Sequence, residues 1–181
     1  MNSHRFLKLR IVAVILFTTA LLIPVHSFSA SAALPAIPGG PKFQMVNAHQ
    51  FIPYRPETTT YVWNDELVNP GSEDNFNQAA LSLPDHIKIN KMVVYFYDNN
   101  PDKGFCAALW RFDPATGDHL ALAELCTIDG DALDQYRTAV DTSIVEPWVD
   151  QQRYSYYLEV FVQPAGDTVR IGAVRIDYRG Y

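Results

Sequence analysis

Hydrophobic and polar residues alternate over short segments of this chain, and turn-forming residues separate these segments. The clearest alternation is YSYYLEVFV at 154–162, where every second residue is Tyr, Leu or Val. A period of two is typical of a strand with one buried face. In the next apolar segment, 168–178, the hydrophobic phase shifts at Gly172. This shift predicts a β-bulge or bend.

Other segments rich in aromatic and β-branched residues also predict strands. They lie at 49–54, 58–63, 76–83, 87–98 and 136–145, and 104–130 adds the two arms of a hairpin. The run MVVYFY within 87–98 is apolar enough for a central strand. Only 131–136 suggests a helix, of one or two turns. The pattern therefore predicts an all-β domain, an antiparallel β-sandwich of eight or nine strands.

The N-terminal segment, 1–32, has the parts of a secretory signal peptide. Basic residues at positions 5, 8 and 10 precede an apolar run at 11–23, and Ala30-Ser31-Ala32 forms an A-x-A cleavage site. The run is shorter than the roughly 20 residues that span a bilayer, so we expect no stable membrane insertion after cleavage. An uncleaved signal anchor is the alternative. The signal peptide predicts a secreted protein, extracellular or periplasmic.

Cleavage leaves 149 residues, which is enough for one domain. The part that follows, 33–48, is rich in proline and glycine, and predicts a spacer before a sandwich domain at 49–181. The mature chain has 11 basic and 20 acidic residues, a net charge of −9. Such a charge repels phosphate backbones, so we exclude nucleic acid as a partner.

The hairpin at 104–130 contains the only two cysteines of the chain, Cys106 and Cys126, on either side of the turn sequence DPATGD. Residues that face each other in an antiparallel hairpin have a constant index sum. A sum of 232 pairs the two cysteines and agrees with the proline and glycine of the turn. The same register pairs Ala108 with Glu124, Trp110 with Leu122 and Phe112 with Leu120.

We interpret Cys106 and Cys126 as a disulfide, because facing residues lie within disulfide range and exported proteins meet oxidising conditions. A zinc site would need further ligands, for which only His86 and His119 come into question. A catalytic cysteine would need an oriented histidine and reducing conditions, and the sequence indicates neither.

The loop 98–104 begins like a calcium-binding loop, with oxygen-bearing side chains at Asp98, Asn100 and Asp102. The remaining positions do not fit, because Lys103 stands where the loop glycine is needed and Leu109 where the bidentate glutamate is needed. An acidic turn between two strands explains the same residues. We expect no bound metal and no other cofactor.

Aromatic residues are abundant in this chain, and flat aromatic rings can pack on the C–H face of a sugar. Trp63, before Asn64, and Trp148, in the turn sequence EPWVD, are the tryptophans that we expect to be exposed. Both are candidates for binding a polysaccharide or another cell-envelope partner. The competing interpretation is packing inside the sandwich, which we expect for Trp110.

No catalytic motif stands out, since the sequence has no G-x-S-x-G elbow, no H-E-x-x-H pair and no glycine-rich phosphate loop. The leading hypothesis is a secreted, non-enzymatic β-sandwich module with a binding or structural role at or beyond the cell envelope. The alternative is a secreted carbohydrate-active hydrolase with two carboxylates from separate strands. The oligomeric state stays open.

Three stretches resemble a family of small exported bacterial proteins without an assigned activity. They are LPDHIKINKMVVYFYDNN at 83–100, VDQQRYSYYLEV at 149–160 and GAVRIDY at 172–178. The likeness extends from about Phe51 to the end of the chain. It implies a jelly-roll-like sandwich outside the cytoplasm, and it carries over no catalytic residue.

Overall fold

The computed structural model describes residues 42–54, 61–127 and 133–180, and of residues 61 and 63 only the backbone. These residues belong to one compact unit, 36–181. In these ranges, no helix is long and apolar enough to cross a membrane. The signal peptide expected at 1–32 lies outside the described residues and remains a prediction.

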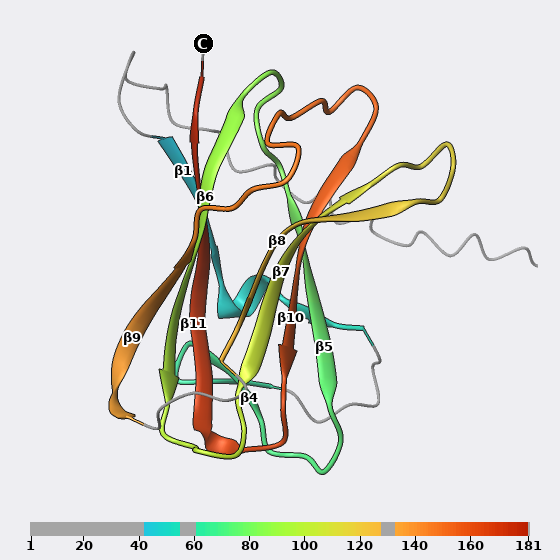
Figure 1. Cartoon of the computed structure of the whole chain (residues 1–181). Coiled ribbons are helices and arrows are strands. Elements are labelled where there is room, and N and C mark those ends of the chain that lie inside the picture. The colour runs from blue at the N-terminus through green and yellow to red at the C-terminus, as the bar shows by residue number, and fades with distance from the viewer. Residues whose placement is uncertain (1–41, 55–60, 128–132, 181) are drawn as a thin grey trace, which may run out of the picture. The chain divides into compact units, whose positions relative to one another are not determined.

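The strands form two antiparallel sheets, as Figure 1 shows. The six-stranded sheet has the order β3 (Tyr61–Trp63), β4 (Glu66–Asn69), β11 (Gly166–Arg179), β6 (Lys88–Asp98) and β9 (Leu133–Asp141), and β1 (Lys42–Asn47) also pairs with β11. The five-stranded sheet has the order β2 (Ile52–Pro53), β5 (Asn75–Leu81), β10 (Ser155–Val162), β7 (Phe105–Phe112) and β8 (His119–Cys126). A short 3-10 turn, η1 (Ala48–Gln50), follows β1.

From β4 to β11 the chain crosses between the two sheets at every connection except the β7–β8 hairpin. Strands β4, β6, β9 and β11 lie in the six-stranded sheet, and β5, β7, β8 and β10 lie in the five-stranded sheet. This order is that of an eight-stranded jelly roll. The expected all-β antiparallel sandwich is therefore confirmed. In the described ranges, eight strands have six or more residues, and the shorter β2, β3 and β4 add to them.

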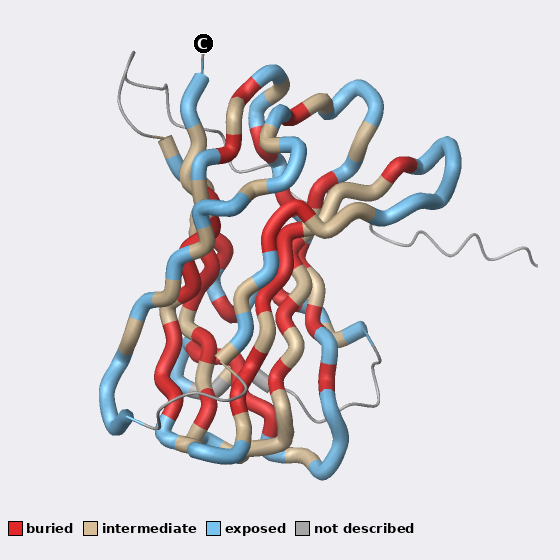
Figure 2. Tube along the Cα trace, in the orientation of Figure 1, coloured by how far each residue is buried: buried red, intermediate tan, exposed pale blue. Residues whose placement is uncertain are grey.

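The hydrophobic core lies between the sheets (Figure 2). Buried and less buried residues alternate most regularly in β5 and β10, whereas β9 has no buried residue. In β10 the buried residues are Tyr156, Leu158, Val160 and Val162, as the alternation predicts. In β11 the pairing with β6 shifts register between Ile171 and Ala173, which confirms the bulge at Gly172. Because of this bulge, residues of both parities in β11 reach the core.

The spacer expected at 33–48 is wrong from Lys42 onwards. Residues 42–47 form β1, which pairs with 173–178 of β11, and Val46 is buried in the core. Proline and glycine are concentrated before Lys42, so the segment KFQMVN is free to add a strand to the sheet.

The helix expected at 131–136 is wrong over its described residues, 133–136. These residues begin β9, in which Tyr136 pairs with Tyr97 of β6. A helix of one or two turns is marginal by itself, so pairing with a long neighbouring strand decides the conformation.

Strand β4 was not expected from the sequence. It follows a two-residue turn at Asn64 and Asp65, where φ is 48° and 65°.

The register of the β7–β8 hairpin agrees with the prediction at one end only. Cys106 faces Cys126 and Ala108 faces Glu124, as the sum of 232 requires. Beyond Leu109 the register shifts by one residue, so Trp110 faces Ala121 and Phe112 faces His119. The pairings of Trp110 with Leu122 and of Phe112 with Leu120 are therefore wrong. The extra residue in β8 brings Leu122 into the core, where it is fully buried.

Candidate functional site

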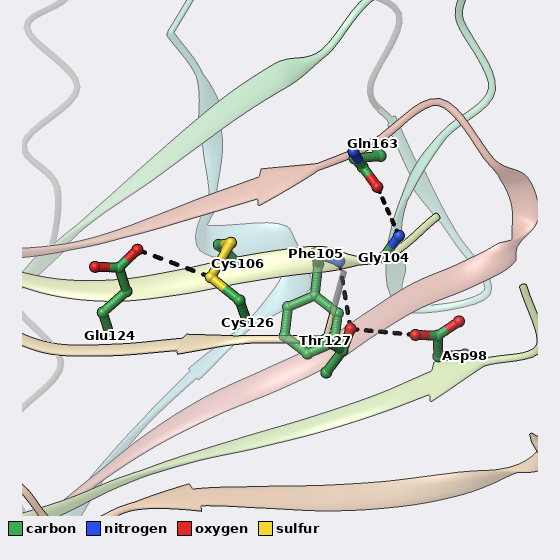
Figure 3. The surroundings of a disulfide bond; sticks show 8 residues. All are labelled: Asp98, Gly104, Phe105, Cys106, Glu124, Cys126, Thr127 and Gln163. Atoms are coloured by element: carbon green, nitrogen blue, oxygen red, sulfur yellow. Dashed lines mark hydrogen bonds between the residues drawn. A yellow bond between two sulfur atoms is a disulfide. The ribbon is translucent and has the colours of Figure 1, made fainter. Parts of the chain in front are cut away.

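Cys106 and Cys126 form a disulfide between β7 and β8, with 4.1 Å between their Cα atoms (Figure 3). Glu124 lies beside it, with its Oε1 atom 3.8 Å from Cys126 Sγ. Within the described ranges, these three residues are the only group of cysteine, histidine or acidic side chains that is compact enough for a metal ion. Because the two sulfurs are bonded to each other, neither is a thiolate that could bind a metal. The pair is a staple, as the sequence predicts.

Two of the three side chains proposed for calcium, those of Asp98 and Asn100, accept hydrogen bonds from other groups of the protein. Asp98 is buried; its Oδ1 accepts the N–H of Asn100 at 3.1 Å, and its Oδ2 accepts the hydroxyl of Thr127 at 3.1 Å (Figure 3). Asn100 Oδ1 accepts the N–H of Asp102 at 3.0 Å. These bonds are two successive Asx turns. They show how 98–104 folds between two strands, and the calcium candidate at Asp98, Asn100 and Asp102 stays a prediction.

Trp148 lies on the connection between β9 and β10 and is 45% exposed. It makes an isolated bridge with Lys88, and the ammonium of Lys88 lies 5.8 Å from the centre of the indole ring. A pocket of about 510 Å³ beside it is also lined by His86 and Gln152. Trp63 lies in β3, but its side chain is outside the described part, so its role remains a prediction.

Trp110 lies on the solvent side of the five-stranded sheet, so the core position expected for it is wrong. The core side of β7 is formed by Phe105, Ala107 and Leu109, which are fully buried. The next residue in the strand necessarily points the other way. There, the indole ring of Trp110 packs against the ring of Tyr157 in β10, with 12° between the planes.

Four neighbouring strands share this solvent side, which we call the aromatic face. It consists of the outward residues of β5, β10, β7 and β8, arranged in rows across the strands. In the order β5, β10, β7 and β8, the disulfide row consists of Phe76, Phe161, Cys106 and Cys126, and the polar row consists of Gln78, Glu159, Ala108 and Glu124. The tryptophan row consists of Ala80, Tyr157, Trp110 and Ala121. The end row, which lacks a residue of β5, consists of Ser155, Phe112 and His119. Neighbouring rows are two residues, roughly 7 Å, apart along a strand.

Aromatic rings are in contact within the disulfide row. The rings of Phe76 and Phe161 lie 4.9 Å apart between centroids, and Phe76 is 45% exposed. Tyr54 extends the row at the β2 edge, where its N–H donates to the carbonyl of Phe76 at 2.8 Å. Tyr54 is also exposed. The disulfide row thus offers a band of aromatic and sulfur atoms to the solvent.

The tryptophan row and the end row form a second aromatic band. Phe112 and His119 lie 4.7 Å apart between ring centroids, and His119 Nδ1 is 2.9 Å from the hydroxyl of Tyr157. Burial raises the pKa of Tyr157, and the carboxylate of Glu159 raises it further. Tyr157 therefore keeps its hydroxyl proton at neutral pH and is able to donate a hydrogen bond.

The polar row lies between these two aromatic bands. Gln78 Nε2 donates to Glu159 Oε2 at 2.9 Å, and Ala108 separates Glu159 from the exposed Glu124. At the β8 edge, Asp141 Oδ2 accepts the N–H of Glu124 at 3.2 Å. Burial works against ionisation of Asp141, but hydrogen bonds from Ser143 and Glu124 outweigh it and lower the pKa of this carboxyl. The polar row thus ends in a third negative charge.

The two outer faces of the sandwich differ in charge. No position of the aromatic face carries lysine or arginine. On the six-stranded sheet, by contrast, the guanidinium of Arg170 lies 4.0 Å from the ring centroid of Tyr97, and that of Arg175 lies 5.7 Å from Tyr95. The aromatic rings of that sheet are thus stacked against cations, whereas those of the aromatic face contact one another.

The sequence argument missed the aromatic face, although part of the pattern was visible. In YSYYLEVFV the residues between the buried ones are Ser155, Tyr157, Glu159 and Phe161, and they form the β10 part of the face. The strand order that places them between β5 and β7 depends on contacts between distant segments. The alternation predicted an outward side, but not which residues of other strands lie beside it.

Comparison with known proteins assigns no family to this chain. No family model matches the sequence, and neither does any curated protein. Similar solved structures include the C-terminal CBM6 module of a marine laminarinase from Zobellia galactanivorans, with 11% identity, a TM-score of 0.49 and coverage of 75% of this chain and 98% of that one.

Two further solved structures show a comparable likeness. One is the CBM36-1 domain of a xylanase from the hindgut metagenome of Trinervitermes trinervoides (8% identity, TM-score 0.46, 77% of this chain and 98% of that one). The other is the xylan-binding module CBM86 from Roseburia intestinalis (12% identity, TM-score 0.45, 76% of this chain and 96% of that one). With TM-scores under 0.5, these likenesses assign neither a family nor a function to this chain.

Proposed function

We propose that this domain binds a polysaccharide on the aromatic face. The observation that carries the proposal is the arrangement of rows on that face, with aromatic side chains on both sides of a polar row. A sugar has two kinds of surface, a C–H face that packs on aromatic rings and hydroxyl groups that donate hydrogen bonds. Both find a complement within four neighbouring strands.

The polar row supplies the hydrogen-bond acceptors. Glu159 is held by Gln78, and Glu124 is exposed on the next strand but one. Hydrogen bonds to a charged acceptor are about twice as strong as those between neutral groups. Because the backbone of a sheet fixes the spacing of these side chains, little conformational entropy is lost when a ligand binds.

The domain acts outside the cytoplasm, as an extracellular or periplasmic module without catalytic activity. The signal peptide predicted at 1–32 supports export, and so does the Cys106–Cys126 disulfide, because disulfides form and persist mainly in oxidising compartments. The acidic mature chain and the carboxylates of the aromatic face disfavour nucleic acid. A polymer of the cell envelope or of the surroundings is the partner that fits this location.

The proposal is tested by retention on insoluble cellulose, chitin and peptidoglycan, and by mobility in gels that contain soluble xylan, β-glucan or mannan. We expect the wild-type protein to be retained by at least one polymer, and Trp110→Ala and Phe76→Ala to lose most of this retention. Phe43→Ala is the matched control, since Phe43 is 58% exposed but lies on the six-stranded sheet. No retention of the wild type, or equal retention of all variants, would overturn the proposal.

One observation favours a hydrolase as the second candidate. Glu159 and Glu124 lie in the same row, two strands apart, so their Cα atoms are about 10 Å from each other. Glycosidases that invert configuration use two carboxyl groups about 6.5–9.5 Å apart. Release of reducing ends from the retained polymer, lost in both Glu159→Gln and Glu124→Gln, would establish this activity.

A further inference from the structure

We propose that the polysaccharide chain continues from the aromatic face over the end of β5 into the pocket beside Trp148, which forms a distal subsite. This inference rests on the proposed function, because it assumes that the aromatic face binds the same chain. The parts of the structure that carry it are two pockets at one end of the sandwich and the turn that lies between them.

The first pocket, of about 280 Å³, lies at the end of the aromatic face where β5 ends and β10 begins. Its lining includes Ala80 at the end of β5 and Ser155 at the start of β10, together with Gln151 and Tyr154 from the preceding turn. Ala80 belongs to the tryptophan row and Ser155 to the end row. The pocket therefore begins where the aromatic face ends.

The second pocket, of about 510 Å³, contains Trp148 and is also lined by His86, Asp150 and Gln152. Gln151 lines the first pocket and Gln152 the second, so the turn that contains both residues is a wall common to the two pockets. The connections β5–β6 and β9–β10, which supply these residues, lie at the same end of the sandwich (Figure 1). The backbone N–H of His86 donates a hydrogen bond of 3.0 Å to the carbonyl of Val149, which joins the two connections.

The common wall is fixed in place by hydrogen bonds. Asp150 Oδ1 accepts the N–H groups of Gln152 and Arg153, at 3.1 and 3.2 Å. The N–H of Asp150 itself donates to the hydroxyl of the buried Tyr156, at 3.0 Å. On the other side, Asp85 Oδ1 accepts the N–H of Gln151 at 3.0 Å. A wall ordered before binding costs little further entropy when a ligand contacts it.

The second pocket has the chemistry of a sugar site. The exposed indole of Trp148 offers a flat apolar ring, and the imidazole of His86 and the amide of Gln152 offer hydrogen-bond donors and acceptors. The backbone of His86 is in the left-handed region, with φ at 57°, which is unfavourable for a non-glycine residue. Glu146, two residues before Trp148, has φ at 44°. Such conformations persist only where the surrounding structure enforces them, and they are concentrated at ligand-binding sites.

The test compares oligosaccharides of two to eight residues from cellulose, xylan, β-1,3-glucan and chitin by isothermal titration calorimetry. For the series that binds, we expect the affinity of wild type to rise about tenfold or more from short to long chains. Trp148→Ala and Gln152→Ala should lose this gain for long chains and keep the wild-type affinity for short ones. Trp110→Ala should weaken binding at every length, and Phe43→Ala should change none.

The outcomes separate this inference from the proposed function. Unchanged affinity for long chains in both pocket variants would overturn the distal subsite and leave binding on the aromatic face intact. Equal losses for short and long chains in Trp148→Ala would also overturn it, because the pocket would then be the primary site. No binding of any oligosaccharide by wild type would overturn the proposed function itself. Two pocket variants are used, and their thermal midpoints identify a variant that fails to fold.

Discussion

The guanidinium of Arg153 lies 3.2 Å from the carboxylate of Asp113, so the turn beside the pockets is tied to the tip of the β7–β8 hairpin. The N–H of Ala115 also donates to Asp113. This backbone hydrogen bond is the main cause that lowers the pKa of Asp113; burial opposes it, and Arg153 adds to the lowering.

A lowered pKa in the folded state means that folding favours the charged carboxyl. The charged carboxylate of Asp113 thus stabilises the fold fully at pH values above 3.8, the ordinary pKa of an aspartate. This contribution is lost as the pH falls through the lowered pKa of the folded state. We expect Asp113→Asn to reduce the thermal midpoint at pH 7 and to have little effect near pH 2. Asp118→Asn, which removes a charge from the same turn, is the control. Equal midpoints of wild type and Asp113→Asn at pH 7 would contradict this.

The disulfide should stabilise the domain substantially. The two cysteines are separated by 20 positions in the sequence. A bond across such a loop restricts the unfolded chain, and this restriction raises the free energy of unfolding by about 3 kcal/mol. Cys106→Ser combined with Cys126→Ser should lower the thermal midpoint by roughly 10 °C. Thiol titration of the unfolded wild type without reductant checks the bond directly. Two reactive thiols in that titration would show that the staple is absent.

Substitution by alanine should reduce the stability of the domain at one glycine, Gly104, and hardly at another, Gly172. A Cβ at Gly104 would lie 2.7 Å from the carbonyl oxygen of Thr127, beside the disulfide, and backbone atoms there have no room to move. A Cβ at Gly172 would meet only Tyr95 O, at 3.7 Å. We expect Gly104→Ala to cost about 1–3 kcal/mol in urea unfolding, and Gly172→Ala less than about 0.5 kcal/mol. Equal effects would show that the close approach at Gly104 is not present.

The charge of the aromatic face should decide which polymers bind. Glu159, Glu124 and Asp141 place carboxylates along the polar row, and no position of the face carries lysine or arginine. Neutral or amine-bearing glycans should therefore bind better than uronic acid polymers, most clearly at low salt. Glu159→Gln combined with Glu124→Gln should raise the affinity for polygalacturonate several-fold. A wild type that prefers polygalacturonate would be inconsistent with this account.

Local sequence patterns predicted much of the fold. The alternation in 154–162 placed the buried residues of β10 correctly, and the phase shift located the bulge at Gly172. The index sum placed Cys106 opposite Cys126. Each of these features depends on residues that are close in the chain, and each therefore leaves a local pattern.

The remaining features depend on partners far away in the chain. Strand β1 forms because 173–178 offers an edge to 42–47, and β9 forms where a helix was expected because β6 lies beside it. The aromatic face arises because β10 lies between β5 and β7, which places Tyr157 next to Trp110. The buried positions of β7 decide that Trp110 faces outwards, and the bulge in β8 decides that its partner is Ala121. Nothing in the local sequence indicates this order of strands.

The most direct test of the central claim is a nuclear magnetic resonance titration of the mature chain with a hexasaccharide of the polymer that retains it. The indole N–H of Trp110 is a suitable reporter, since it is buried and has no hydrogen-bond partner in the described part of the chain. We predict saturable shift changes at this indole and at outward residues of β5, β10, β7 and β8. Changes confined to the six-stranded sheet, around Tyr95 and Arg175, would contradict binding on the aromatic face.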